Sequence, residues 1–231
     1  MDINVNLGEI RKRATAAAVA AGRDSRDIRL LAVSKTMSAD IVAEAFAAGQ
    51  RIFAENKVQE WLDKVDKLPP ECEWHLIGRL QTNKVKYLDR RIALIHSLDR
   101  FDLLRVLEEQ GAKKDIMWDV LVQVNIAGDQ AKAGMPPGET ADFLTAVKDH
   151  PHVRVHGLMT IGALEASLEE TRTFFRDLRL LRDKLRGQNW PSSIQLRELS
   201  MGMSQDFEVA IAEGATMVRV GRQIFGERVT F

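Results

Sequence analysis

The sequence predicts an α/β protein folded as a single (β/α)₈ TIM barrel. Eight short apolar runs alternate with stretches of helical period along 231 residues, and such alternation indicates parallel strands. Eight strand–helix units in this length fit a compact barrel, since α/β barrels commonly run to about 200–250 residues as one domain. The alternative is an open doubly wound sheet. Its G-x-G-x-x-G turn after a strand is absent from the sequence.

The elements are expected in the following order. An extra N-terminal helix covers about Val5 to Ala21 and ends at Gly22. The first strand, Ile28 to Val33, is almost continuously apolar, which indicates a strand covered on both faces. Ser38 caps the helix that follows it. The other strands begin near Arg51, Glu73, Ile92, Trp118, Val153, Ile194 and Thr216.

Each of the first seven strands is expected to be followed by a helix-period stretch, and the last by a short turn from Arg222. No Pro-, Gly- or Ser-rich linker divides the chain, so residues 1–231 are expected to form one domain.

Composition excludes several classes of protein. Lys and Arg number 33, as do Asp and Glu, so the basic excess of a dedicated nucleic-acid binder is missing. The single cysteine, Cys72, excludes an intramolecular disulfide and a metal site built on several thiolates. The start MDINVNLGEI does not resemble a secretory signal, and Ala14 to Ala21 is too short and weakly apolar to span a bilayer. We expect a cytoplasmic protein with no metal, nucleic-acid or membrane partner.

Lys35 directly follows the first apolar strand. In such barrels the active site lies at the carboxyl ends of the strands. A lysine at the rim of a dry core can have a lowered pKa, which makes its amine a nucleophile toward aldehydes. The alternative is a lysine that extends from the strand end into solvent.

The loops after the last two strands carry groups that suit a phosphate. Ser200 and Ser204 supply hydroxyls, Gly221 begins a short helical turn, and Arg219 and Arg222 add positive charge. The alternative is an ordinary strand–helix loop in which Ser204 caps the following helix. A nucleophilic lysine and a phosphate cradle at one barrel mouth fit pyridoxal 5′-phosphate (PLP) bound as a Schiff base. A phosphorylated sugar processed by a Schiff-base aldolase fits the same two features.

These residues lie in stretches that resemble a known family. The chain is identified as a member of the PLP homeostasis protein family, and it resembles more distantly the N-terminal barrel domain of alanine racemase. The stretches are LLAVSKT around Lys35, AENKVQE from Ala54, EWHLIGRLQTNK from Glu73, VNIAGDQAKAG from Val124, GLMTI from Gly157, LSMGMSQDFEVAI from Leu199, and GATMVRVGRQIFG from Gly214.

The resemblance implies a set of cofactor contacts. PLP would be held on Lys35, with Arg219 beside the pyridine nitrogen. Ser200 and the backbone around Gly221 and Arg222 would contact the phosphate. Asn56 and Met203 would line the cofactor.

The resemblance also implies a protein that maintains the cellular supply of PLP and amino-acid balance without catalysis. The alternative is a small PLP-dependent amino-acid racemase. Two-base racemisation needs a second proton acceptor, which in alanine racemase is a tyrosine. The only tyrosine in this sequence, Tyr87, is expected to be a packed or surface aromatic instead. Apo forms of PLP enzymes are candidate partners, although the sequence shows no docking motif for them. A monomer is expected.

Overall fold

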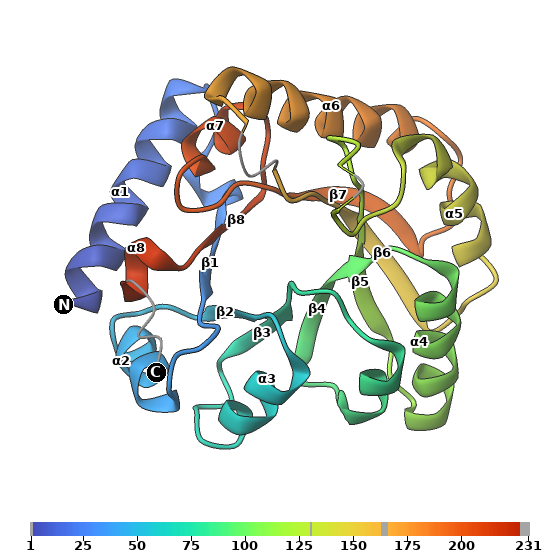
Figure 1. Cartoon of the computed structure of the whole chain (residues 1–231), viewed down its shortest axis with the longest axis horizontal. Helices are drawn as coiled ribbons and strands as arrows, with labels where there is room; N and C mark the ends of the chain where they lie inside the picture. The colour runs from blue at the N-terminus through green and yellow to red at the C-terminus, as the bar shows by residue number, and fades with distance from the viewer. Residues whose placement is uncertain (1, 130, 163–165, 227–231) are drawn as a thin grey trace.

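Eight parallel strands close into a barrel in chain order, with β8 paired to β1 (Figure 1). This computed structural model describes residues 2–129, 131–162 and 166–226. The strands are β1 (Arg29–Val33), β2 (Ile52–Glu55), β3 (Glu73–Leu76), β4 (Ile92–Leu98), β5 (Trp118–Gln123), β6 (Val153–Met159), β7 (Ile194–Ser200) and β8 (Met217–Val220). Each expected apolar run contains one strand, so the predicted barrel is confirmed.

Helices surround the ring of strands (Figure 1). The α-helices are α1 (Ile3–Ala20), α2 (Ala39–Ala47), α3 (Val58–Val65), α4 (Phe101–Lys114), α5 (Thr140–Val147), α6 (Leu168–Arg186), α7 (Phe207–Ala212) and α8 (Arg222–Phe225). Three 3₁₀ segments complete the described elements: η1 (Ser25–Asp27), η2 (Thr82–Tyr87) and η3 (Pro137–Glu139).

The helix-period stretches expected after the first seven strands form α-helices in each case except after β3, which is followed by the 3₁₀ segment η2. Within η2 only Val85 is buried, so the segment lacks the apolar stripe that holds a longer helix against a barrel. The ammonium group of Lys114 donates hydrogen bonds to the carbonyls of Lys86 and Leu88 at 2.7 and 2.6 Å. These bonds give a partner to carbonyls at the end of η2, where a helical segment has no internal donors left for them.

The extra N-terminal helix forms as the sequence predicts. Asp2 caps α1 by accepting a hydrogen bond from the Val5 N–H at 3.1 Å. Gly22, just past its end, has a φ of +66°, a conformation that glycine adopts without strain. Its buried side chains recur every three or four residues and face the barrel, and α1 lies beside α7 and α8 (Figure 1). The Ser38 cap of α2 is also confirmed, with its hydroxyl 3.4 Å from the Ile41 N–H.

Side-chain alternation along the strands separates two cores. One cluster contains the residues Leu31, Val33, Ala54, Ile77, Leu94, Leu121, Met159 and Met217, and the larger one packs strands against helices. Because successive side chains of a strand point to opposite faces, Leu31 and Val33 share the inward face of β1, and Lys35 comes two residues later in the turn after the strand. Lys35 thus follows the inward-facing side of β1 at the carboxyl end of the strand.

The described ranges contain no helix with the length and apolarity needed to cross a membrane. Within the same ranges, no three His, Cys, Asp or Glu side chains gather in a way that could hold a metal ion.

Gly157→Ala tests the tight approach of β6 to β7. A Cβ at this position would lie 1.9 Å from the Glu198 carbonyl oxygen, so the backbones must separate. We expect the free energy of unfolding, measured by urea titration, to fall by about 1–3 kcal/mol or more. Gly8→Ala is the control: its Cβ meets nothing within 4 Å and should stabilise α1 by about 0.5–1 kcal/mol. Equal stabilities of the two variants would contradict this packing.

Candidate functional site

The backbone around Lys35 is tightly specified. The N–H of Ser34 donates to the Ala54 carbonyl at 3.0 Å, which continues the β1–β2 pairing up to the lysine. Thr36 then has a φ of +67°, and its hydroxyl donates to the Lys35 carbonyl at 2.5 Å. A β-branched residue rarely adopts a positive φ, and such strained residues concentrate at functional sites. This turn fixes where the partly exposed Lys35 leaves the strand.

A buried ion pair lies behind this turn. The Lys64 ammonium group donates to Glu55 Oε1 at 2.6 Å and to the Ser34 carbonyl at 2.8 Å. The Ser34 hydroxyl donates to the same carboxylate oxygen at 2.7 Å. Glu55 is fully buried at the end of β2, facing α3, and its other oxygen, Oε2, has no hydrogen-bond partner. Burial raises the pKa of Glu55 to about 7, against the opposing effect of Lys64.

Asn56 lies beside Lys35 on the neighbouring strand. Val33 pairs with Ala54 in the β1–β2 register, so Lys35 and Asn56 each follow a paired residue by two positions. The backbone after β3 approaches Asn56 closely, since a Cβ on Gly78 would lie 2.2 Å from the Asn56 carbonyl oxygen. Asn56 is therefore placed at the mouth by both of its neighbouring strands.

Arg219 is a buried cation on the other side of Lys35, opposite Leu31 in the β8–β1 register. Its Nη1 donates to the Ser200 hydroxyl at 2.7 Å and its Nη2 to the Thr160 carbonyl at 2.8 Å. Burial lowers the pKa of Arg219 to about 10, and the group remains charged at pH 7. Among the described residues, no carboxylate lies within ion-pair distance of this guanidinium.

The loops after β7 and β8 meet at Ser204 and Gly221. The N–H of Gly221 points to the Ser204 hydroxyl at 3.4 Å. A Cβ on Gly221 would lie 3.1 Å from the Val33 carbonyl oxygen, so a side chain would crowd β1. The alternative that Ser204 caps α7 is wrong, because Asp206 occupies the cap position and no side chain caps that helix. Ser204 is thus directed toward the loop after β8.

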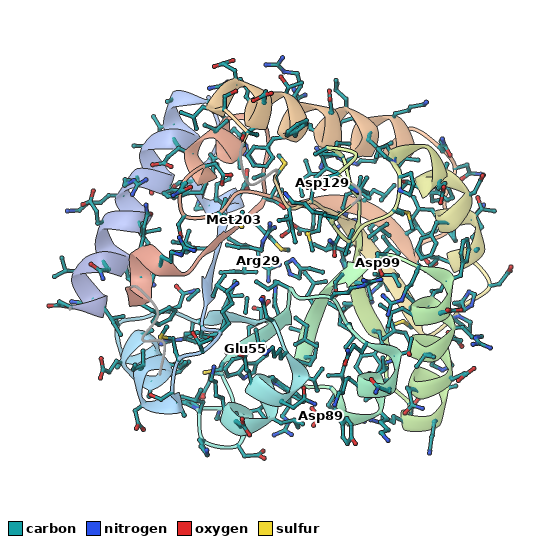
Figure 2. The ribbon with its side chains drawn as sticks, viewed as in Figure 1. Arg29, Glu55, Asp89, Asp99, Asp129 and Met203 are labelled. Carbon is teal, nitrogen blue, oxygen red and sulfur yellow. The ribbon has the colours of Figure 1, made fainter. Side chains whose placement is uncertain are left out.

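Met203 and Arg222 flank this pair of loops. Met203, labelled in Figure 2, lies in the loop after β7. It is 38% exposed, and its N–H donates to Asp206 Oδ1 at 2.5 Å. Arg222 is exposed at the first position of α8.

The predicted site residues therefore lie on one arc of the barrel, because β7, β8, β1 and β2 are consecutive neighbours in the closed sheet. Of the seven, Ser200 and Arg219 are joined by a hydrogen bond. The other five are Lys35, Asn56, Met203, Gly221 and Arg222.

Sequence reasoning missed two contacts between buried polar residues, although it considered His75 as a barrel histidine. One is the Glu55–Lys64 pair, and the other is a contact of His75 with His96 inside the barrel at 2.9 Å. A signal for the second contact is present in the sequence: polar Glu73 and His75 alternate with apolar residues on β3. Alternation of that kind indicates a polar strand face.

The fold and this arc of residues define a barrel of the alanine racemase type. The profile of the family described as "Alanine racemase, N-terminal domain" matches residues 5–229. Similarity to named proteins is more specific. The Pyridoxal phosphate homeostasis protein of Aquifex aeolicus is 44% identical over 96% of each chain. That of Escherichia coli K12 is 38% identical over 98% of this chain and 97% of its own. The chain belongs to the pyridoxal phosphate homeostasis protein family, as its resemblance indicated.

A solved structure agrees in fold. PipY of Synechococcus elongatus, determined with PLP bound, is 34% identical and has a TM-score of 0.84, covering 97% of this chain and 100% of PipY.

The raised pKa of Glu55 predicts a pH-dependent stability. The folded state keeps this proton up to about pH 7, whereas the unfolded state releases it near 4.5. The free energy of unfolding should therefore fall as pH rises through this window, by roughly 2–3 kcal/mol relative to Glu55→Gln, which has no proton to release. Urea titrations of both proteins at pH 5 and pH 8 measure the difference. Parallel pH dependences would show that Glu55 ionises at its ordinary pKa.

Proposed function

We propose that this protein binds PLP as a Schiff base on Lys35 and buffers or delivers the cofactor. The observation that supports the proposal is the strand order: Lys35 follows β1, which pairs on one side with β2, just before Asn56, and on the other side with β8, which carries Arg219. Ser204 and Gly221 meet in the loops after β7 and β8. The names of the relatives and the PLP found in PipY support it. When bound, PLP supplies an aldehyde that condenses with an amine and a ring that can withdraw electrons.

The phosphate end fits the loops after β7 and β8. The Ser204 hydroxyl and the Gly221 N–H face each other, and Gly221 has no side chain to block an approaching group. Arg222 adds a positive charge at the rim. Ser200 stays a predicted phosphate contact from the resemblance; its hydroxyl accepts a hydrogen bond from Arg219. We propose that Ser204, Gly221 and Arg222 make the main phosphate contacts.

The ring end fits Arg219. Its guanidinium has only N–H donors and a fixed charge, so it can donate to an unprotonated ring nitrogen and disfavours a protonated one. Asn56 and Met203 would line the ring from the neighbouring loops. A ring nitrogen that stays unprotonated withdraws electrons weakly, which suits a binding protein better than a catalyst.

We infer that the protein does not catalyse racemisation. Tyr87, the only tyrosine in the sequence, lies in η2, is 47% exposed and has Lys84 and Lys86 against its ring, which fits the surface aromatic that the sequence predicts rather than a second base. Apo forms of PLP enzymes as recipients, a monomeric state and the cytoplasm as compartment stay predictions of the sequence.

Lys35→Ala tests the attachment site. Borohydride reduction of the wild type with PLP should fix the cofactor to the peptide containing Lys35, as read by mass spectrometry, and the variant should show at least a tenfold lower yield. Lys57→Ala is the matched control, because Lys57 is an exposed lysine just after β2. Equal labelling of Lys35→Ala and wild type would refute attachment at this residue.

Proton exchange tests the non-catalytic role. The PLP-loaded protein should leave the α-proton of alanine and serine unexchanged in deuterated water, with NMR spectra matching those of free PLP plus amino acid. Exchange that is accelerated well above that background, and is lost in Lys35→Ala, would establish a racemase-type catalyst instead.

A further inference from the structure

A chain of polar contacts crosses the inside of the barrel from its base to its mouth. At the base, Glu73 begins β3 and pairs with Arg29, the first residue of β1, which Figure 2 shows within the ring of strands. His75 Nε2 lies 2.9 Å from Glu73 Oε1, and His75 Nδ1 lies 2.9 Å from His96 Nε2. His96 Nδ1 lies 2.9 Å from the Ser200 hydroxyl, which receives the hydrogen bond from Arg219.

The chemistry of the two ends fixes the direction of every bond. Glu73 is a carboxylate with acceptors only, and its hydrogen bond with His75 lowers its pKa, so His75 Nε2 carries the hydrogen. Burial lowers the pKa of both histidines, so each ring is neutral and has one N–H. His75 Nδ1 is then an acceptor for His96 Nε2–H. His96 Nδ1 in turn accepts from the Ser200 hydroxyl, whose oxygen accepts from Arg219.

This arrangement satisfies every ring nitrogen of two fully buried histidines. If His96 Nδ1 donated to Ser200 instead, the serine hydrogen would have no acceptor among these contacts. His75 Nδ1 and His96 Nε2 would then face each other as two acceptors. A buried polar group left without a partner costs about 1–3 kcal/mol, so one direction is strongly favoured.

The charged residues around these polar contacts are consistent with the assigned hydrogen-bond directions. Arg29 opposes protonation of both histidines, whereas Glu73 and Glu198 favour it at His75, and burial exceeds both effects. At the other end, Asp206 acts on Arg219 from a distance beyond an ion pair. Arg219 is thus anchored by a hydroxyl and a carbonyl, and no adjacent carboxylate in the described chain neutralises it.

We propose that Glu73, His75, His96 and Ser200 are positioning residues that hold the Arg219 guanidinium in place to donate to the ring nitrogen of PLP. The inference rests on the proposed function, since it assigns these residues to one end of the proposed cofactor. In this proposal Glu73, at the base of the barrel, helps to position a side chain that acts at the mouth.

The tautomers of the histidines test the chain without any cofactor. In PLP-free protein labelled with ¹⁵N-histidine, long-range ¹H–¹⁵N spectra at pH 7 should show His75 and His96 as neutral Nε2–H tautomers. Their signals are assigned by single substitutions. A protonated ring, or an Nδ1–H tautomer at either residue, would overturn the proposed direction.

Ser200→Ala separates a ring contact from a phosphate contact. Loss of a hydrogen bond to the charged Arg219 should raise the Kd about tenfold, and equally for PLP and for pyridoxal, which lacks the phosphate. Ser97→Ala is the matched control, because Ser97 is a fully buried serine whose hydroxyl has no partner. A loss confined to PLP would make Ser200 a phosphate ligand, and no loss would make its role purely structural; both results overturn the proposal.

Glu73→Gln is the second variant, since it changes a half-exposed residue at the base and keeps the side-chain volume. We expect it to change the His75 and His96 signals and to raise the Kd for both ligands severalfold. Glu108→Gln is its control, because Glu108 pairs with His152 at 2.7 Å outside the barrel. Unchanged signals and affinities in Glu73→Gln would overturn the proposal.

The two proposals fail in different ways. If the wild type binds neither PLP nor pyridoxal, the proposed function fails, while the tautomer experiment still reports on the chain. If the wild type binds PLP through Lys35 and Ser200→Ala binds it equally well, only the positioning role fails.

Discussion

The pairing of β8 with β1 is the constraint on which the site depends. It joins segments almost 190 residues apart and sets Leu31 opposite Arg219, so the strand bearing Lys35 lies directly beside the strand bearing the buried cation. The β1–β2 register then adds Asn56, and the loop after β7 adds Ser204. Because inward and outward side chains alternate, a slip of one residue in β1 would turn Lys35 toward the helices.

Charged side chains inside the molecule are stabilised in two different ways. Glu55 and Lys64 are in direct contact behind the Lys35 turn, and once Glu55 is ionised, above about pH 7, each charge offsets part of the other's desolvation cost. Arg219 instead binds neutral oxygens and is linked to the carboxylate of Glu73 only through Ser200 and two histidines. The first arrangement stabilises a turn. The second leaves a buried positive charge directed at the mouth, where an unprotonated ring nitrogen is the acceptor that it suits.

Much of the fold could be predicted from the sequence because its signals are local. Apolar runs located all eight strands, and capping residues located the ends of α1 and α2. Helical periodicity wrongly predicted an α-helix after β3. The segment there, η2, is polar and has no apolar stripe to hold an α-helix against the barrel. The chain through His96 could not be predicted, because its bond to Ser200 joins residues 104 apart whose meeting depends on the closed barrel. For Ser200 and Ser204, the sequence predicts two hydroxyls near the loops but does not show which of them lies inside the barrel.

A crystal structure of the wild type with PLP tests the central claim most directly. The account predicts continuous density from the Lys35 amine to the cofactor, with Arg219 within hydrogen-bond distance of the ring nitrogen. It also predicts the phosphate on Ser204 and the Gly221 N–H, and Ser200 still bound to Arg219 and His96. PLP joined to another lysine, or a ring nitrogen facing away from Arg219, would contradict the account.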